Sequence, residues 1–230
     1  MNIAILGAMR EEIEPILAKV GNYESHNYGN NIYYTCQYEG HNLVIAYSKI
    51  GKVFSSLSAT IMIERFNAEV LLFSGVAGAI NPSLKIGDLI MASSLVQHDV
   101  DITAFGHPYG FIPESSVMIE SDVKLRAIAK NVASRLGVEL DEGIIATGDQ
   151  FVASSEKKDF IKDTFGADAL EMEGASVASV CSNLGVPFFI LRSISDSADG
   201  AAEVDFDTFL ASSASVSANF ILEMVRELGN

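Results

Sequence analysis

The stretch 186-VPFFILRSISDSAD-199 decides the fold class, because a long apolar segment runs directly into hydroxyl and carboxyl side chains. Its first six residues carry no polar side chain, which is typical of a strand covered on both faces in a parallel or mixed sheet. Ligands of open α/β sheets bind beyond the carboxyl ends of such strands. We therefore expect Asp196 to lie at a functional site, although the residue alone is equally compatible with the N-cap of a following turn.

Other apolar segments end in the same way, in glycine or polar residues, and they alternate with segments of helical periodicity. The predicted strands are 2–6, 42–48, 69–74, 87–92, 143–147 and 167–170. The predicted helices are 11–17, 53–66, 123–136, one capped at 154–156, one through Val177 and Val180, and 206–228. Residues 22–36 are predicted as an edge hairpin that turns at Gly29-Asn30. This order predicts an α/β fold with a central mixed, mostly parallel sheet flanked by helices on both faces.

Composition predicts one domain, 1–230, because 49% of the 230 residues are hydrophobic. A formal charge of −15 argues against nucleic-acid binding, which depends on Lys and Arg. The N-terminus meets acidic residues too early for a signal peptide or a membrane span. The two cysteines form no recognisable disulfide or zinc motif, so we expect a cytoplasmic protein.

Three acidic residues follow predicted strands: Glu12, Glu173 and Asp196. Carboxyl groups that share an apolar pocket can have their pKa values driven apart, so that one donates a proton while another stays an anion. This pattern suits a hydrolase that needs an acid and a base. Simpler interpretations remain: Glu12 belongs to an acidic first helical turn that looks solvated, and periodicity does not decide whether Glu171 or Glu173 points inward.

Two further features have alternative interpretations. The glycines of 75–78 either let the backbone approach a ligand or form a plain tight turn. Phe151 either stacks on a flat heterocycle or packs in the core. His98 and His107 lie near two aspartates, but their spacing matches no metal-ligand template, so we expect exposed loop residues and no metal site.

Seven motifs, in order along nearly the whole chain, resemble the 5'-methylthioadenosine/S-adenosylhomocysteine nucleosidases of the nucleoside phosphorylase superfamily. They are IAILGAMREEIEP (3–15), SKIGKV (48–53), SGVAGAI (74–80), DITAFG (101–106), TGDQFV (147–152), LEMEGASVA (170–178) and RSISDSAD (192–199). The resemblance implies a nucleoside phosphorylase-like fold and hydrolysis of the N-glycosidic bond of both nucleosides, releasing adenine for methionine salvage and adenosylhomocysteine recycling. It implies no cofactor.

The resemblance also assigns roles to residues. It implies that Glu12 holds and deprotonates the attacking water, while Asp196, with Ser195 beside it, protonates adenine at N7. It implies that Glu173 binds the ribose hydroxyls as an anion, assisted by the backbone of Met172. The other implied contacts are Phe151 stacked on adenine, the main chain of Val152 at its edge, backbone approach at Gly78, and an apolar lining of Met9, Ile50 and Phe206 around the ribose and 5'-thio group.

Members of this family are homodimers, and the resemblance implies that Ile102, Phe105 and Pro113 reach into the neighbour's pocket. This would account for the apolar side chains of ITAFGHPYGFIP, and a lid packed on its own subunit is the alternative. Val76 departs from the family, since a small hydroxyl residue is common there, and the departure bears on fine specificity.

Three other functions are weighed against hydrolysis. A phosphorylase needs donors for phosphate, and Arg10 beside two glutamates is a poor anion site. A nucleoside sensor has no use for both Glu12 and Asp196. A Rossmann dehydrogenase is excluded, because GAMREE lacks the GxGxxG pattern. We therefore predict hydrolysis and leave open the preference among methylthioadenosine, adenosylhomocysteine, 5'-deoxyadenosine and 6-aminofutalosine-type substrates.

Overall fold

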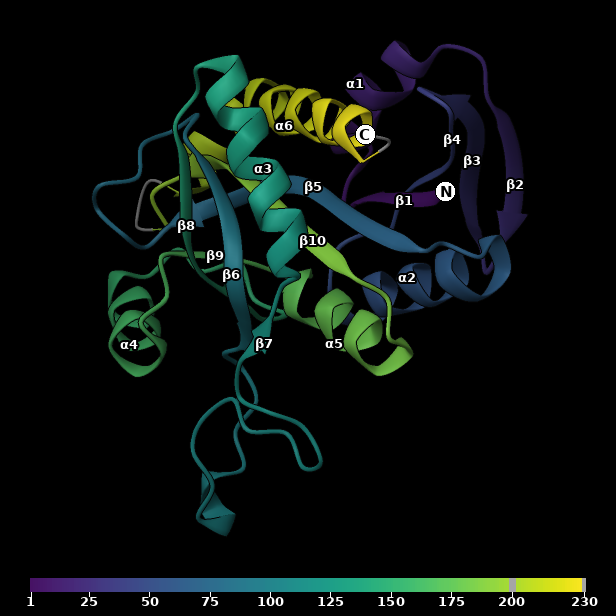
Figure 1. Cartoon of the computed structure of the whole chain (residues 1–230). Helices are drawn as coiled ribbons and strands as arrows, with labels where there is room; N and C mark the ends of the chain where they lie inside the picture. The colour runs from purple at the N-terminus through teal and green to yellow at the C-terminus, as the bar shows by residue number, and fades with distance from the viewer. Residues whose placement is uncertain (199–201, 229–230) are drawn as a thin grey trace.

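The computed structural model describes residues 1–198 and 202–228, and its strands form one mixed sheet with helices on both faces (Figure 1). The strands are β1 (Asn2–Gly7), β2 (Glu24–Tyr28), β3 (Asn31–Tyr38), β4 (His41–Tyr47), β5 (Val70–Ala79), β6 (Leu89–Gln97), β7 (Ile119–Glu120), β8 (Leu140–Thr147), β9 (Ala169–Glu171) and β10 (Phe188–Asp196). The helices are α1 (Arg10–Val20), α2 (Lys52–Phe66), η1 (Thr103–Phe105), α3 (Val123–Leu136), α4 (Ser155–Phe165), α5 (Gly174–Leu184) and α6 (Ala202–Glu227). The predicted α/β fold is confirmed, and Asp199 of the opening stretch lies outside the described residues.

Two runs of parallel strands make up the sheet. Strands β4, β1, β5 and β10 form one run, and β6, β8 and β9 form the other. Antiparallel pairings of β10 with β6 and of β5 with β9 join the runs. Strands β5, β10, β6, β8 and β9 therefore close on themselves, and we call this arrangement the strand ring. It brings the ends of β5, β9 and β10 together.

The predicted hairpin lies at one edge of the sheet, where β2 and β3 pair in antiparallel register and β3 pairs with β4 in the same way. Its turn falls at Gly29 and Asn30, as predicted, with φ angles of 56° and 57°. Two consecutive positive φ values are what a tight two-residue hairpin turn requires. The hairpin lies outside the strand ring and extends the sheet.

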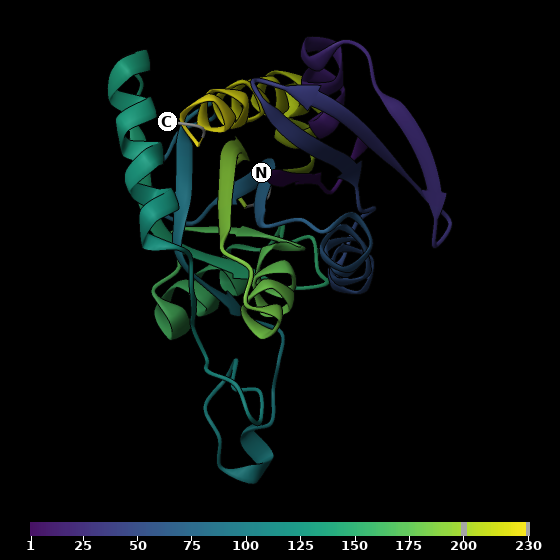
Figure 2. The same ribbon diagram turned by 45° about the vertical axis from the view of Figure 1, so that its right-hand side comes forward.

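The two faces of the sheet carry different helices (Figure 2). Side chains of α1, α3 and α6, such as Ile13, Val132 and Phe220, form one core cluster with the sheet. Helices α2 and α5 cover the other face, through residues such as Met62 and Val177. Helix α4 packs beside them over a smaller cluster.

Helix α6 begins at Ala202, before the start at Phe206 that periodicity predicts. Among the described residues it alone is long and apolar enough, by length and composition, to cross a membrane. Half of its most apolar window, 50%, is buried inside the protein. The helix also packs on α1, β5 and β10, so its apolar side chains belong to the core.

Strand β5 continues to Ala79, so the predicted end at Ser74 is wrong, and of the two interpretations of residues 75–78 the plain tight turn is wrong. It stays paired with β10 as far as Gly78. A Cβ atom on Gly75 would lie 2.8 Å from Oε1 of Glu12, and one on Gly78 would lie 2.6 Å from Oδ1 of Asp196. The two glycines therefore make room for carboxyl groups inside a regular strand.

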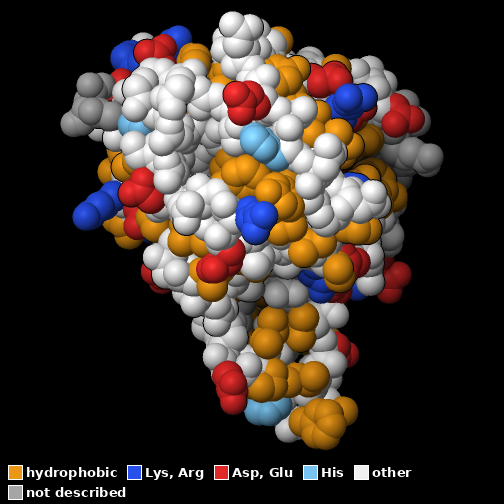
Figure 3. Space-filling model, turned by 90° about the vertical axis from the view of Figure 1, so that its right-hand side faces the viewer, with side chains coloured by type: hydrophobic (Ala, Val, Ile, Leu, Met, Phe, Trp, Pro, Cys, Tyr) orange, Lys and Arg blue, Asp and Glu red, His pale blue; other side chains and the backbone are white. Residues whose placement is uncertain are grey.

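Residues 100–118 leave the body of the protein between β6 and β7, and we call them the projecting segment (Figures 1 and 2). Phe105, in the short helix η1 of this segment, is 81% exposed. Hydrophobic side chains gather on this segment and on the adjoining face of the body (Figure 3). Exposed apolar surface of this kind marks an interaction site more often than a free surface.

Candidate active site

A cavity of about 310 Å³ lies where β1, β5, β9 and β10 end. The structure brings together here all the pocket residues that the resemblance assigns to this chain: Met9, Glu12, Ile50, Gly78, Phe151, Val152, Met172, Glu173, Ser195, Asp196 and Phe206. Ile102, Phe105 and Pro113 do not line it and lie in the projecting segment. Their roles are taken up below as a proposal.

Glu12 is buried, at 2% exposure, so its interpretation as a solvated surface acid is wrong. The turn between β1 and α1 directs its carboxylate inward, where Oε2 accepts hydrogen bonds from the backbone N–H groups of Ala8 (2.5 Å) and Met9 (2.9 Å). Oε1 accepts from the N–H of Val76 at 3.0 Å. Burial raises the pKa of Glu12, and the Arg192 charge and the three N–H groups oppose that rise. The result is a fixed carboxylate with increased basicity.

Asp196 ends β10 and is 4% exposed. Its Oδ2 accepts a hydrogen bond from the Ser195 hydroxyl at 2.9 Å, and its Oδ1 accepts from the N–H of Ala198 at 2.8 Å. The second bond is a local turn contact, two residues along the chain. This contact explains why the sequence around Asp196 resembles a cap. Asp196 also lines the cavity, where its carboxyl group can donate a proton to a ligand.

Glu173 and Glu171 are both buried, so both point inward. Oε1 of Glu173 accepts a hydrogen bond from the N–H of Gly51 at 2.7 Å. Burial, with the nearby charge of Glu171, raises the pKa of Glu173 to about 8. A pKa this high favours the protonated carboxyl group at neutral pH. The ribose-binding anion expected from the sequence therefore requires release of this proton when substrate binds.

The raised pKa of Glu173 predicts a pH-dependent stability. The folded state keeps a proton that the unfolded state, with a carboxyl pKa near 4.5, has lost. This contribution is fully present below the lower pKa and is lost as the pH rises through about 8. We expect the thermal midpoint of the unliganded protein to decrease as the pH is raised from the lower to the higher of these pKa values. In Glu173→Gln this decrease should be smaller by about a few degrees. Thermal scans across this range measure it.

Glu156→Gln, at an exposed position, is the control for this pH series and should follow the wild-type curve. If the thermal midpoint changed equally with pH in the wild type, Glu173→Gln and Glu156→Gln, the raised pKa could not be assigned to Glu173. Glu12 also has a raised pKa, so part of the slope should remain in Glu173→Gln.

A buried ion pair between a lining residue of the pocket, Glu171, and Arg192 beside it was not predicted from the sequence. Nη2 of Arg192 lies 2.7 Å from Oε2 of Glu171, with both side chains at 3% exposure or less. Glu171 also accepts hydrogen bonds from the N–H of Gly174, at 2.7 Å, and from the Thr147 hydroxyl. The guanidinium lies over the ring of Phe73. The sequence did contain a signal for this pair: Arg192 is the one cationic residue in an apolar strand, and arginine is rarely buried unless it is paired.

We expect Arg192→Met to lower the free energy of unfolding by about 3–5 kcal/mol, because it leaves Glu171 charged, buried and unpaired. Urea unfolding measures the change. Arg135→Met, which breaks a pair with Glu223 at an arginine 45% exposed, should cost less than about 1 kcal/mol. Similar losses in both variants would contradict the importance of burial.

The mouth of the cavity is aromatic. Phe151 is 49% exposed, so its interpretation as a core residue is wrong. Its ring meets that of Phe206 edge to face, with centroids 5.8 Å apart. Val152 beside it is buried, and Val76 adds an apolar side chain to the lining. A flat, partly apolar ligand fits these walls.

His98 is buried, so the prediction of an exposed loop residue is wrong for it and right for His107. Its ring packs against Gly148, where a Cβ atom would lie 2.4 Å from Nε2. Burial lowers its pKa. Within residues 1–198 and 202–228, no three His, Cys, Asp or Glu side chains are grouped as a metal site requires.

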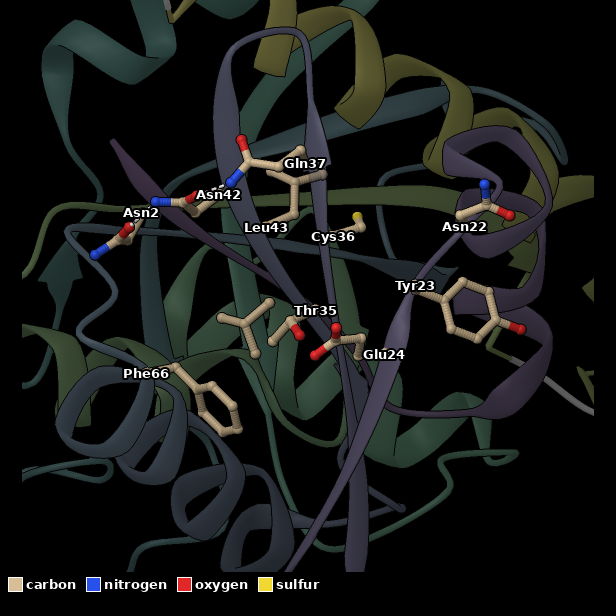
Figure 4. A pocket seen from close by; sticks show the side chains of 11 residues that line it. Asn2, Asn22, Tyr23, Glu24, Thr35, Cys36, Gln37, Asn42, Leu43 and Phe66 are labelled. Atoms are coloured by element: carbon tan, nitrogen blue, oxygen red, sulfur yellow. Dashed lines mark hydrogen bonds between the residues drawn. The ribbon is translucent and has the colours of Figure 1, made fainter.

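A second hollow, of about 610 Å³, lies along the β2–β4 hairpins (Figure 4). Three of its polar side chains bond to one another: Gln37 donates to Asn42, which donates to Asn2 at 2.7 Å. Its one acidic lining residue, Glu24, is exposed. Without a buried acid or base it is a weaker candidate than the cavity at the strand ends.

Comparison with known proteins agrees with this geometry. The phosphorylase superfamily matches residues 2–226. The aminodeoxyfutalosine nucleosidase of Campylobacter jejuni is 56% identical over 228 residues, covering 99% of this chain and 100% of the relative. The 5'-methylthioadenosine/S-adenosylhomocysteine nucleosidase of Anoxybacillus flavithermus is 38% identical, with 99% of each chain covered. A Helicobacter pylori nucleosidase of the latter name, solved as an Asp-to-Asn mutant with 5'-methylthioadenosine in the active site, matches with a TM-score of 0.97, 52% identity and 98% coverage of both chains.

Proposed function

The chain belongs to the phosphorylase superfamily, and from this premise we propose that it hydrolyses the N-glycosidic bond of adenine nucleosides modified at the 5' position. Two groups of relatives support the proposal. Relatives from Campylobacter jejuni and Helicobacter pylori, at 56% and 54% identity, are named for aminodeoxyfutalosine. Solved structures from the same two species, at 56% and 53% identity, are named for methylthioadenosine and adenosylhomocysteine, as is a relative at 38%. We include aminodeoxyfutalosine and both thio-nucleosides, because proteins above 50% identity carry both names and the pocket residues expected for the thio-nucleosides line one cavity.

The observation that carries the proposal is the placement of two buried carboxyl groups in one cavity. Glu12 lies beside Gly75 and Asp196 beside Gly78 of the same strand. Three residues of a strand span roughly 10 Å at about 3.3 Å per residue. Inverting glycosidases separate their acid and base by about 6.5–9.5 Å to admit a water molecule. A spacing of this order leaves room for a sugar and an attacking water between the two groups.

In the proposed reaction Asp196 protonates adenine at N7, which makes the base a better leaving group. Positive charge then develops on the ribose, as in other glycosyl transfers. Glu12 takes a proton from the water that attacks the anomeric carbon. Glu173, with the backbone of Met172, binds the ribose hydroxyls and, once ionised, stabilises the positive charge. Asp196 gives its proton to adenine and recovers one from solvent afterwards, while Glu12 releases to solvent the proton that it took from water.

The remaining lining residues bind rather than react. Phe151 stacks on adenine and the main chain of Val152 reads its edge, while Ser195 orients Asp196. The 5' substituent lies against Met9, Ile50 and Phe206. Gly78 serves by leaving space for Asp196, so its role is this close packing and not only a backbone approach to substrate.

Water fits the cavity better than phosphate as the attacking group. None of the described lining residues is Lys, Arg or His, and four are acids: Glu12, Glu171, Glu173 and Asp196. The nearby Arg192 is paired with Glu171. Phosphate binding normally relies on Arg, Lys or free backbone donors.

We extend the proposal to a cytoplasmic homodimer of one domain, 1–230, that acts in methionine salvage or in the reactions that consume aminodeoxyfutalosine. Apolar side chains exposed on α2, such as Val53 (76%), and Phe105 on the projecting segment support the dimer. In it, Ile102, Phe105 and Pro113 would line the partner's pocket, which they do not reach in their own chain.

Adenine release from a small panel tests the proposal. The purified protein should release adenine from aminodeoxyfutalosine, methylthioadenosine and adenosylhomocysteine, at matched concentrations and without added phosphate. 5'-Deoxyadenosine tests the need for a 5' substituent. Cleavage that depends on phosphate or arsenate would show a phosphorylase, and binding of adenine without cleavage of any nucleoside would show a sensor. Either result would overturn the proposal.

A further inference from the structure

We infer that Asp99 and Lys52 form a positioning pair, which sets the affinity for nucleoside by joining the Phe151 wall of the cavity to the segment that holds Glu173. Neither member of the pair lines the cavity. The inference rests on the proposed function, because it assigns these residues an effect on the binding of the adenine nucleoside.

The pair belongs to a closed set of contacts, the Asp99–Lys52–Asp149 network. Nζ of Lys52 lies 2.7 Å from Oδ1 of Asp99, with side chains 19% and 13% exposed. Oδ2 of Asp99 accepts a hydrogen bond from the N–H of Asp149 at 2.9 Å. Oδ1 of Asp149 accepts from the N–H of Lys52 at 2.8 Å, which closes the network.

Each end of this network is attached to a wall of the cavity. Asp149 precedes Gln150 and Phe151, which line the cavity mouth. On the other side, Gly51 next to Lys52 donates to Oε1 of Glu173 at 2.7 Å. Gly51 has a φ of 100°, and a Cβ atom there would lie 2.9 Å from Oδ1 of Asp149. The two segments are therefore in direct contact, and a side chain at Gly51 would separate them.

The charge of Asp99 maintains the network. Burial acts to raise the pKa of Asp99, but hydrogen bonds from Lys52 and from the N–H of Asp149 outweigh it, and the pKa is lowered. The group is thus an anion facing two donors. The pair is partly buried, so removing one partner should cost more than breaking a fully exposed pair and less than breaking a fully buried one.

The proposed acid and base are held by other elements. The turn between β1 and α1 positions Glu12, and the end of β10 positions Asp196. Loss of the network should loosen the adenine and ribose contacts while the reacting groups stay in place. This predicts an effect on KM rather than on kcat.

A double-mutant cycle on the whole protein, with methylthioadenosine as substrate, tests the inference. Asp99→Asn and Lys52→Met should each raise KM about tenfold and change kcat less than about twofold. The double variant should be no worse than either single variant, because both remove the same network. The dissociation constant of adenine, measured by calorimetry, should rise in parallel and gives a readout independent of turnover.

Lys130→Met and Glu142→Gln are the matched control, since they break an ion pair of 2.7 Å outside the cavity lining and should leave KM unchanged. The inference is overturned if KM and adenine affinity stay at wild-type values in the Asp99 and Lys52 variants, even with a lower thermal midpoint. It is also overturned if kcat falls while KM stays unchanged. The same holds if the increases in KM of the two single variants add in the double variant. A wild-type protein that binds adenine but cleaves no nucleoside refutes the proposed function alone, because the adenine affinities still test the network.

Discussion

Asp196→Asn is expected to slow adenine release by about 100- to 10,000-fold, the usual contribution of a general acid. The amide has the size of the carboxyl group but cannot supply a proton to N7. Its oxygen can still accept the hydrogen bond from Ala198, and the Ser195 hydroxyl can accept from its NH₂ group instead of donating. We therefore expect the fold, its stability and substrate binding to be retained.

Single-turnover adenine release and equilibrium binding of methylthioadenosine, measured on the same preparation, separate loss of chemistry from loss of binding. Asp159→Asn makes the same substitution at an exposed position of α4 and should be as active as the wild type. A wild-type rate in the Asp196 variant would remove that residue from proton donation.

Glu12→Gln is expected to slow the reaction by a similar factor, about 100- to 10,000-fold, and to destabilise the protein as well. Both oxygens of Glu12 accept from backbone N–H groups, two on Oε2 and one on Oε1. The NH₂ group of glutamine must face one of these donors and leaves it unsatisfied. The cost of such a buried group is about 1–3 kcal/mol.

Adenine release and urea unfolding of the same variant measure the two losses. Glu11→Gln, in the same helical turn but exposed, should change neither. Full activity in Glu12→Gln would show that another group activates water. Unchanged stability would show that the three N–H contacts do not constrain the side chain.

The two substitutions therefore give different combined results, although both replace an acid with its amide. Asp196→Asn should lose activity alone, since its neighbours include a hydroxyl that can reverse its role. Glu12→Gln should lose activity and stability together, since its neighbours are fixed donors.

The general fold could be predicted because its central strands are apolar on both faces and end in short polar or glycine-rich segments. The same pattern placed Glu12, Glu173 and Asp196 at strand ends, and the structure brings them into one cavity. The burial of Glu12 was not predictable from its acidic surroundings, because its carboxylate also accepts from the N–H of Val76 in β5, 64 residues away in the sequence.

The errors share a physical cause, which is long-range packing. Two glycines three residues apart are typical of a turn, yet Gly75 and Gly78 lie within β5. Carboxyl groups from distant parts of the chain occupy the space that a Cβ atom would need at these positions. His98 has the neighbours of a loop residue, but its ring packs on Gly148, fifty residues further along the chain. The pairing of Arg192 with Glu171 likewise joins separate strands, which local periodicity does not record.

The strand ring has a consequence for the dynamics of the site. Its shortest member, β9, has three residues, and only two of them, Ala169 and Leu170, pair with β5. Local opening of a protein begins where few backbone bonds must break, so the ring is easiest to open between β9 and β5. Met172 and Glu173 directly follow this strand, so an opening there would part the two halves of the cavity while the outer sheet stays intact. A bound nucleoside that contacts both halves would stabilise the closed ring, so local unfolding between β9 and β5 should become rarer when the ligand is bound.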